Sequence, residues 1–318
     1  MNQSKITKTL HIILPAAFLL AGSATALLAA ASAESATPAA PPDAPAALSA
    51  GEWKYTEIRR IPAVEAKQGV VADSQHLYVI DNHTIGKYRK DTGERVGGWE
   101  CPKGDPLIHI NAGLMHDGKL YGAHSNSPGV PNLSSVEIWD PATMRHIGTH
   151  SFGRADGSLT WLERHNDRWL ACFVHYRTRK DGQPGLKRGG EPDRGPEWSR
   201  LVEYDDQWRE TGAWAFPDDL TKILGVRGFA MSAGLFGPGG FLYVTGHDDE
   251  ALYLLEMPKG GPTLKWVATI PISAKGQAFG WDPDDPGLFY NILRGKRGKE
   301  SVVIEGRITH PKYLPEKK

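Results

Sequence analysis

The chain is short of cysteine and carries no excess of charge of either sign. Only two cysteines occur among its 318 residues, Cys101 and Cys172. They could pair in an oxidising compartment, but Cys172 lies in an apolar stretch, where a buried free thiol is the usual state. Lysine plus arginine balances aspartate plus glutamate at 37 each. This balance argues against nucleic acid or an anionic membrane surface as the general partner.

Three local catalytic signatures are missing as well. The chain has no Gly-x-Ser-x-Gly elbow and no phosphate-binding glycine loop, so serine-hydrolase and nucleotide-dependent functions lack support. It also has no His-Glu-x-x-His motif, which is the short-range signature of a zinc site on a helix. Any active site must therefore be assembled from residues that are distant in the sequence.

The N-terminal segment has the features of an export signal. Lys5 and Lys8 precede an apolar run over residues 12–31, which ends in a small-residue Ala-Ser-Ala sequence. This pattern predicts a secretory signal peptide over residues 1–33, cleaved after Ala33. A retained membrane anchor is the competing interpretation, but the run is alanine-rich and no basic stop-transfer cluster follows it. We expect a periplasmic or secreted protein with no stable membrane insertion after cleavage.

The next segment, residues 34–50, is almost entirely alanine, proline and serine. It cannot bury enough apolar surface to offset the entropy of ordering it, so we expect a flexible linker. Ser23 stands where a lipoprotein signal would have its lipid-bearing cysteine, so a lipid anchor is not expected. Residues 51–318 are long enough for one domain with a substantial core.

This domain contains a short sequence pattern that occurs five times. Each copy is a short apolar strand that contains two adjacent large residues, aromatic or leucine. A polar side chain follows within a few residues: His83, His124, His175, His247 or Arg294. A repeat of short strands at this period indicates a β-propeller, whose blades point equivalent positions toward one central axis.

The blades can be counted from their innermost strands. The candidates start near five polar residues, Gln68, Asn111, Ser158, Ser232 and Gln277. Three of the four spacings fit the roughly 40–50 residues of a four-stranded blade, and the longer one contains an insertion. The fold is therefore predicted to be all-β, a single propeller of five blades, with six as the alternative if the insertion hides a short blade. The N-terminal strand over residues 55–61 is expected to close the ring beside the last blade.

The insertion covers residues 177–200 and follows His175 directly. It contains seven basic residues among glycines and prolines: Arg177, Arg179, Lys180, Lys187, Arg188, Arg194 and Arg200. One interpretation is a mobile basic lid over the mouth of the propeller that attracts an anionic ligand. The other is a solvated surface loop.

In a propeller, the start of each innermost strand and the turn after its neighbour open at the same end. The strand starts named above form the first set of residues at this end. The turns supply the second set, which comprises Asp81, His83, His124, Ser125, Asn126, His175, Tyr176, His247, Asp248 and Arg294, and His109 could join it. We select as substrate-binding candidates Gln68, Asp81, Asn111, Asn126, Ser158, Tyr176, Gln277 and Arg294. Such a polar set suits a small polar or anionic ligand.

The four repeated histidines allow two chemical interpretations. His83, His124, His175 and His247 together could hold a divalent metal such as zinc or iron. The number of residues between the repeated pattern and each histidine differs, however. Because side chains alternate between the two faces of a strand, His247 is expected to point away from the side that the other three share. The second interpretation is a polar or acid–base role for individual histidines, with His124 and His175 as the catalytic candidates.

Two further segments, Gly239–Thr245 and Val136–Pro141, resemble segments of secreted bacterial propellers of the lactonase, cycloisomerase-like and strictosidine-synthase-like group. The resemblance covers most of the domain and implies the propeller fold. The lactonases of that group bind calcium with carboxylate and amide ligands, whereas this chain offers histidines at the comparable mouth. Their catalytic residues therefore do not transfer to this sequence.

Two functions from different classes follow from these observations. The first is an exported enzyme, a hydrolase, lyase or isomerase acting on a small polar or carbohydrate substrate. The second is a non-catalytic propeller that binds a ligand or an envelope protein through the same face. Propellers serve both purposes, so the fold does not choose between them.

Overall fold

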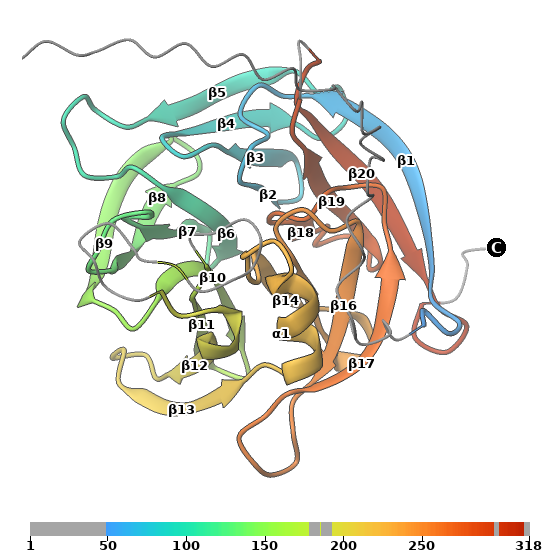
Figure 1. Ribbon diagram of the computed structural model, residues 1–318. Helices are drawn as coiled ribbons and strands as arrows, with labels where there is room; N and C mark the ends of the chain where they lie inside the picture. Colours follow the sequence, from blue (N-terminus) through green and yellow to red (C-terminus); the bar gives the residue numbers. More distant parts are fainter. Residues whose placement is uncertain (1–48, 178–184, 186–192, 296–298, 315–318) are drawn as a thin grey trace, which may run out of the picture. The chain divides into compact units, whose positions relative to one another are not determined.

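The protein is an all-β propeller of five blades, as the sequence predicts. The computed structural model describes residues 49–177, 185, 193–295 and 299–314. Five separate four-stranded antiparallel sheets succeed one another around a central axis (Figure 1). The predicted signal peptide, residues 1–33, lies outside the described residues, as does all but the end of the predicted linker, residues 34–50.

Blades one to four are meanders in which the chain runs from the innermost strand outward. Blade one comprises β2 (Gly69–Ala72), β3 (His76–Ile80), β4 (Thr84–Arg89) and β5 (Arg95–Glu100). Blade two comprises β6 (Ile110–His116), β7 (Lys119–Ser125), β8 (Leu133–Asp140) and β9 (Arg145–Arg154). Blade three comprises β10 (Ser158–His165), β11 (Arg168–Val174), β12 (Arg200–Tyr204) and β13 (Glu210–Ala215).

Blades four and five complete the ring. Blade four comprises β14 (Ala233–Phe236), β15 (Leu242–Thr245), β16 (Ala251–Glu256) and β17 (Lys265–Pro271). Blade five comprises β18 (Gly280–Trp281), β19 (Leu288–Leu293), β20 (Val302–Thr309) and the N-terminal β1 (Lys54–Pro62). The pairing of β1 with β20 is antiparallel and joins the two ends of the domain, as expected. It covers the outer edge of β20, which would otherwise offer unpaired backbone groups.

The core consists of apolar layers between neighbouring blades. Val71 and Ile80 of blade one pack in one cluster with Leu120 and Trp139 of blade two, and each of these side chains is almost fully buried. The other clusters join the remaining neighbours in the same way. The strands are rich in β-branched, leucine and aromatic residues because both faces of a blade are covered.

Blade five departs from the expected strand start at Gln277. Gly276 and Gln277 both have a positive φ, +58° and +65°, and β18 begins only at Gly280. A Cβ on Gly276 would lie 2.3 Å from the carbonyl oxygen of Gly246, so the turn needs glycine at this position. The chain therefore enters blade five through a tight turn.

One helix interrupts the strands of the described part of the chain beside the mouth. Helix α1 (Asp218–Gly225) follows Pro217, carries two aspartates in its first turn and buries Leu220 and Leu224. It contacts the short 3₁₀ helix η1 (Pro196–Trp198) within the predicted insertion. The connection from α1 to β14 then crosses the end of the central channel, so it can contribute side chains there.

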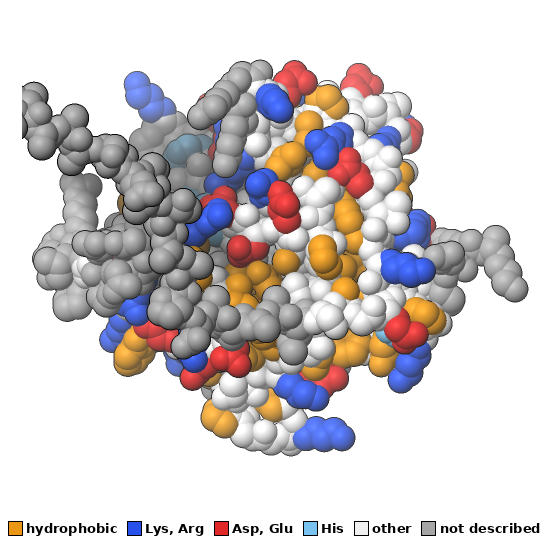
Figure 2. All heavy atoms as spheres, turned by 45° about the vertical axis from the view of Figure 1, so that its right-hand side comes forward, with side chains coloured by type: hydrophobic (Ala, Val, Ile, Leu, Met, Phe, Trp, Pro, Cys, Tyr) orange, Lys and Arg blue, Asp and Glu red, His pale blue; other side chains and the backbone are white. Residues whose placement is uncertain are grey.

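The state of the two cysteines and the mixture of charges on the surface agree with the composition. Cys101 and Cys172 are both free, and Cys172 is fully buried, as the sequence favours. Figure 2 shows basic and acidic side chains mixed over the visible described surface. None of the helices in the described ranges has the length and apolar character needed to span a bilayer.

Candidate functional site

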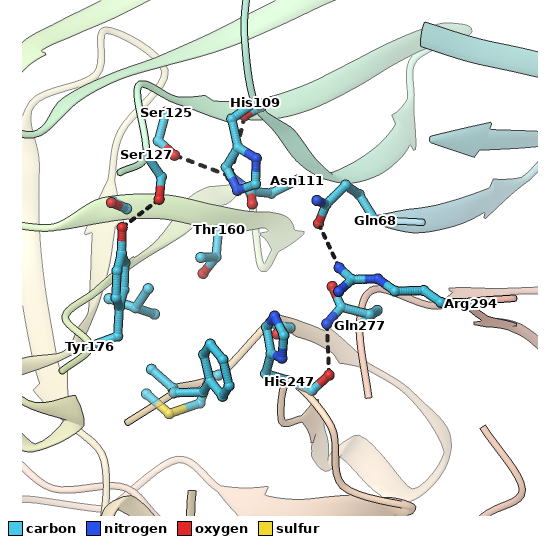
Figure 3. Close-up of a pocket in the computed structure, with 16 residues that line it drawn as sticks. Gln68, His109, Asn111, Ser125, Ser127, Thr160, Tyr176, His247, Gln277 and Arg294 are labelled. Carbon is cyan, nitrogen blue, oxygen red and sulfur yellow. Dashed lines mark hydrogen bonds between the residues drawn. The ribbon is translucent and has the colours of Figure 1, made fainter. Parts of the chain in front are cut away.

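A cavity of about 220 Å³ occupies the mouth of the propeller, where the innermost strands begin and their neighbours end. Gln68, His109, Asn111 and Arg294 are among the polar residues that line it (Figure 3), and its apolar lining residues are Val174, Phe229, Ala230 and Met231. Ten residues that the sequence places at this end line it: Gln68, His109, Asn111, Ser125, Ser158, Tyr176, Ser232, His247, Gln277 and Arg294. The two sets of strand ends therefore do meet at one end of the channel.

Arg294 supplies the positive charge of this cavity. Its Nε donates to the carbonyl oxygen of Lys67, and its Nη2 donates to Gln68 Oε1 at 3.3 Å. Burial lowers the pKa of Arg294, against the raising effect of the Asp248 and Asp81 charges. Among the described residues, no carboxylate lies within ion-pair distance of the guanidinium.

The two nearby acids are engaged with other partners. Asp81 pairs with Lys67 at 2.5 Å, and Asp248 accepts from His247 at 3.0 Å. The lysine partner explains why Asp81, a substrate-binding candidate, lies outside the cavity lining. Arg294 is thus a partly buried cation that neutral oxygens hold in place, an arrangement that favours binding of an anion.

Gln277 is held in its unusual backbone conformation by three hydrogen bonds. Its backbone N–H donates to Gly246, its carbonyl accepts from the Thr245 hydroxyl at 2.7 Å, and its side-chain Nε2 donates to the His247 carbonyl at 2.7 Å. Its amide oxygen makes no hydrogen bond to the described residues and is therefore an acceptor for a ligand. Backbone strain of this kind is concentrated at functional sites.

His247 is the imidazole best prepared for chemistry. Its ring stacks on Phe229, with centroids 3.8 Å apart and planes 9° apart, and its Nδ1 lies 3.0 Å from Asp248 Oδ2. Burial lowers its pKa, while the bond and the charge of Asp248 oppose the shift. Because Nδ1–H donates to the carboxylate, Nε2 of the neutral ring can accept a proton.

His109 is a second imidazole in the lining. Its Nδ1 lies 2.5 Å from Asn82 Oδ1, which also accepts from Gln68 Nε2, so Nδ1 carries the hydrogen. Burial lowers the pKa of His109 to about 4, and the charges of His124 and Arg294 add to the shift. The ring is neutral near pH 7, and its Nε2 is an acceptor.

Hydroxyl and amide groups fill the opposite side. Tyr176 and Ser127 share a short hydrogen bond between their hydroxyls, and Asn111 donates to the Leu159 carbonyl at 2.9 Å. Ser158 Oγ is buried without a hydrogen-bond partner among the described residues. Such a group is costly unless a ligand or a water completes it.

The catalytic candidate His124 does not reach this cavity. Its Nδ1 is 3.0 Å from Ser135 Oγ, and its Nε2 accepts the backbone N–H of Ile108 at 3.3 Å. Burial lowers its pKa, opposed by the Glu137 charge. Both ring nitrogens are engaged, and His124 lines a different cavity between blades one and two.

Three other candidates also lie outside the mouth cavity. His175 is 4% exposed, and its Nε2 is 3.5 Å from Asp156 Oδ1. His83 is exposed at the surface, where its Nδ1 is 3.2 Å from the Leu107 carbonyl. Asn126 closes its own loop, donating to the Pro131 carbonyl and accepting from the backbone of Leu133. Their functional roles stay predictions.

The metal set predicted from the sequence is not assembled in the described part of the chain. No three histidine, cysteine, aspartate or glutamate side chains among the described residues are placed to bind one ion. His247 lines the mouth cavity, whereas His83, His124 and His175 do not. The reason is the differing offset from each strand, because successive side chains of a strand point to opposite faces.

The basic insertion is only partly described, and Arg179, Lys180, Lys187 and Arg188 lie outside the described residues. Arg177 pairs with Glu197 at 2.6 Å, and Arg194 pairs with Asp156 at 2.7 Å. Arg200 lies 3.6 Å from Glu210. These three cations are neutralised locally, so the described part of the insertion adds little positive potential to the mouth.

Sequence reasoning missed part of the lining. Thr160 lies two residues after Ser158 on β10, at an irregularity in the pairing with β11 that the repeat pattern does not reveal. Phe229, Ala230 and Met231 belong to the connection after α1, which has no counterpart in the other blades. Nothing in the repeat pattern could have placed them at the cavity.

Comparison with known proteins does not identify the chain. No protein-family model and no curated protein matches it. Among solved structures 429 chains match, including the RRP9 WD40 repeats, at 10% identity and a TM-score of 0.39 over 82% of this chain and 99% of that one. U3-55K matches with the same identity and TM-score over 81% and 99%, and hydrazine synthase of Kuenenia stuttgartiensis at 12% and 0.39 over 74% and 70%. Likeness at this level carries no argument, and the fold rests on the chain's own sheets.

Proposed function

We propose that the protein is an exported propeller that binds a small, negatively charged polar molecule in the mouth cavity. The observation that supports this most is Arg294, a partly buried guanidinium with no carboxylate in ion-pair distance among the described residues. A buried charge held only by neutral groups is costly, and an anionic ligand would remove that cost.

The rest of the lining narrows the ligand class. Gln277 and His109 offer acceptors for hydroxyl groups, while Asn111 and Gln68 contribute amides. The patch formed by Val174, Phe229, Ala230 and Met231 accepts a short apolar segment. The volume of about 220 Å³ fits a compact ligand better than a polymer. A hydroxylated carboxylic acid, such as a sugar acid, combines these properties.

A second candidate is catalysis on the bound molecule. Asp248 orients His247 so that its Nε2 can act as a base beside the cation Arg294, an arrangement suited to a hydrolase, lyase or isomerase. The resemblance to the lactonase group is compatible with this chemistry. The alternative is a non-catalytic propeller that holds a ligand or an envelope protein at its mouth, because among the described residues only two histidines, His109 and His247, line the cavity.

The first test is a titration of the purified domain with D-gluconate, D-glucuronate and acetate, with uncharged D-glucose as the comparison. Arg294→Gln removes the charge from the cavity, and Arg209→Gln removes a charge from the surface, where Arg209 is 75% exposed. We expect the acids to bind, and Arg294→Gln to weaken them at least about tenfold, the loss expected of a charge-assisted contact. Arg209→Gln should bind like the wild type.

Equal binding by both variants, or equal binding of glucose and glucuronate, would refute the anion-binding proposal. Product analysis by NMR in the same samples separates the two functions. Product formed by the wild type and lost in His247→Gln, with binding retained, identifies an enzyme. A ligand recovered unchanged supports the binding protein.

A further inference from the structure

A second, larger cavity of about 420 Å³ lies between blades one and two, away from the mouth. Trp99 of β5 and the connection through Leu107 form one side. The other side is formed by His124, Glu137 and His146 of blade two. The function proposed for the mouth cavity does not involve this second cavity, and the two cavities have no lining residue in common.

Glu137 is the buried charge of this second cavity. Its side chain is 2% exposed, yet its carboxylate lines the space. Ser135 donates to Oε1 at 2.5 Å, while Thr149 and His146 donate to Oε2 at 2.6 and 2.8 Å. A carboxylate has about four acceptor sites, so one on Oε1 is left for a ligand.

The groups around Glu137 turn their hydrogens toward it. His146 Nε2–H donates to the carboxylate. His124 Nδ1–H donates to Ser135 Oγ, whose own hydrogen goes to Glu137. Asp105 adds a carboxylate to the lining, and no lysine or arginine is among the described residues that line it.

Trp99 gives this acceptor-rich space an aromatic wall. Its ring meets Trp139 edge-on, with centroids 5.1 Å apart, and remains partly exposed. A cation placed between an indole and a desolvated carboxylate gains from both, because the π face is electronegative. The combination of the buried Glu137 carboxylate, the lining residue Asp105 and an indole favours a donor-rich cationic group.

We propose that the cavity between blades one and two is a binding site for an alkylammonium or alkylguanidinium group, with Glu137 as its counter-ion and Trp99 as its aromatic contact. The group can be carried by a small amine or by a basic side chain of a peptide. Both sources present the same chemistry to the cavity.

The repeat supplies a matched control. Glu203 of β12 accepts from Thr211 of β13 at 2.7 Å, just as Glu137 accepts from Thr149 of β9. Glu203 does not line the cavity between blades one and two, and its partner Thr211 is exposed. Glu203→Gln therefore removes an equivalent carboxylate from an equivalent strand without touching the proposed site.

The experiment is a calorimetric titration of the mature protein with n-butylammonium, n-butylguanidinium, the uncharged n-butanol, and the capped peptide Gly-Arg-Gly. We expect millimolar or tighter binding of the cations, none of butanol, at least about tenfold weakening in Glu137→Gln, and no change in Glu203→Gln. The peptide arm tells which source fits: binding tighter than butylguanidinium indicates a peptide, and weaker binding indicates a small amine.

A second variant keeps the test valid if Glu137→Gln fails to fold. Ser151 is exposed and lines the same cavity, so Ser151→Phe should fill the space from its rim while the sheet remains intact. Loss of cation binding in this folded variant supports the site. Cations that bind all the proteins alike, or none of them at millimolar concentration, would refute it.

Discussion

At the scale of single residues, Glu163 shows how burial alone sets an ionisation. It lies on β10, toward the end remote from the mouth, and is 7% exposed. Burial raises the pKa of its carboxyl from 4.5 to about 7, although the backbone N–H groups of Arg164 and Phe236 donate to it and oppose the shift. The folded protein therefore holds this proton more tightly than the unfolded chain does.

This shift predicts the pH dependence of stability. Because the folded pKa is raised, the stabilisation by Glu163 is complete below about pH 4.5 and is lost as the pH rises to about 7. The loss is on the order of 3 kcal/mol in the free energy of unfolding, from 1.36 kcal/mol for each pKa unit. In Glu163→Gln this part of the pH dependence of the free energy of unfolding should vanish. Urea unfolding at several pH values measures it.

The control is Glu256→Gln, which changes a carboxylate at the surface, where the side chain is 44% exposed. Subtracting the unfolding curves of wild type and variant isolates the contribution of each site. A pH slope in Glu163→Gln identical to that of the wild type would contradict the buried-acid account.

The same scale explains which candidate residues could be read from the sequence. Gln68, Asn111, Ser158 and Gln277 follow from strand starts alone, because a propeller brings those positions to one mouth. His124 could not be placed from the sequence, because its hydrogen bond to Ser135 depends on the register in which β7 pairs with β8 of the same blade. A repeated histidine marks a position on a strand, but its partners depend on how the strands pair.

At the scale of elements, β1 determines whether the ring is closed. Its residues pair with β20 from Lys54 opposite Thr309 to Pro62 opposite Val302, with an irregularity after Glu57. Arg59 reinforces the pairing through Glu305 at 2.6 Å, but this pair is partly exposed and adds little. The apolar contact of Ile61, 4% exposed within the cluster that joins blades five and one, should dominate.

Two isoleucines on this strand provide a matched test. Ile61→Ala removes buried methylene groups and should lower the free energy of unfolding by about 2–4 kcal/mol. Ile58→Ala changes the same residue type at a position that is 48% exposed and should cost less than about 1 kcal/mol. Equal losses, measured by chemical unfolding, would show that the closure does not depend on burial by β1.

Elements also show where pattern reading fails. The outer and central strands were predictable because apolar repeats and turn residues recur in every blade. The two-residue β18 was misplaced because Gly276 and Gln277 form a positive-φ turn just where the other blades begin their strand. Helix α1 has no counterpart in the repeat, so neither it nor the lining that follows it could be inferred by analogy between blades.

At the scale of the whole molecule, the two cavities divide the charges of a chain whose formal net charge is zero. The mouth holds Arg294 with neutral partners, and the space between blades one and two holds Glu137 without a lysine or arginine among its described lining residues. Ligands of opposite sign are therefore proposed for two sites on one rigid ring. Rigid elements keep such sites in fixed geometry, which favours recognition of small molecules.

Export is the remaining prediction for the whole chain, and it is open to a direct measurement. Lys5, Lys8 and the apolar run up to the Ala-Ser-Ala sequence predict cleavage after Ala33. Expressed with its own N-terminus in a Gram-negative host, the protein should accumulate outside the cytoplasm with Glu34 as its first residue, read by intact mass and N-terminal sequencing. Ala33→Pro should block processing, because signal peptidase requires a small residue of permissive conformation there. An unprocessed wild-type chain retained in the cytoplasm would refute export and with it the extracytoplasmic ligands proposed for both cavities.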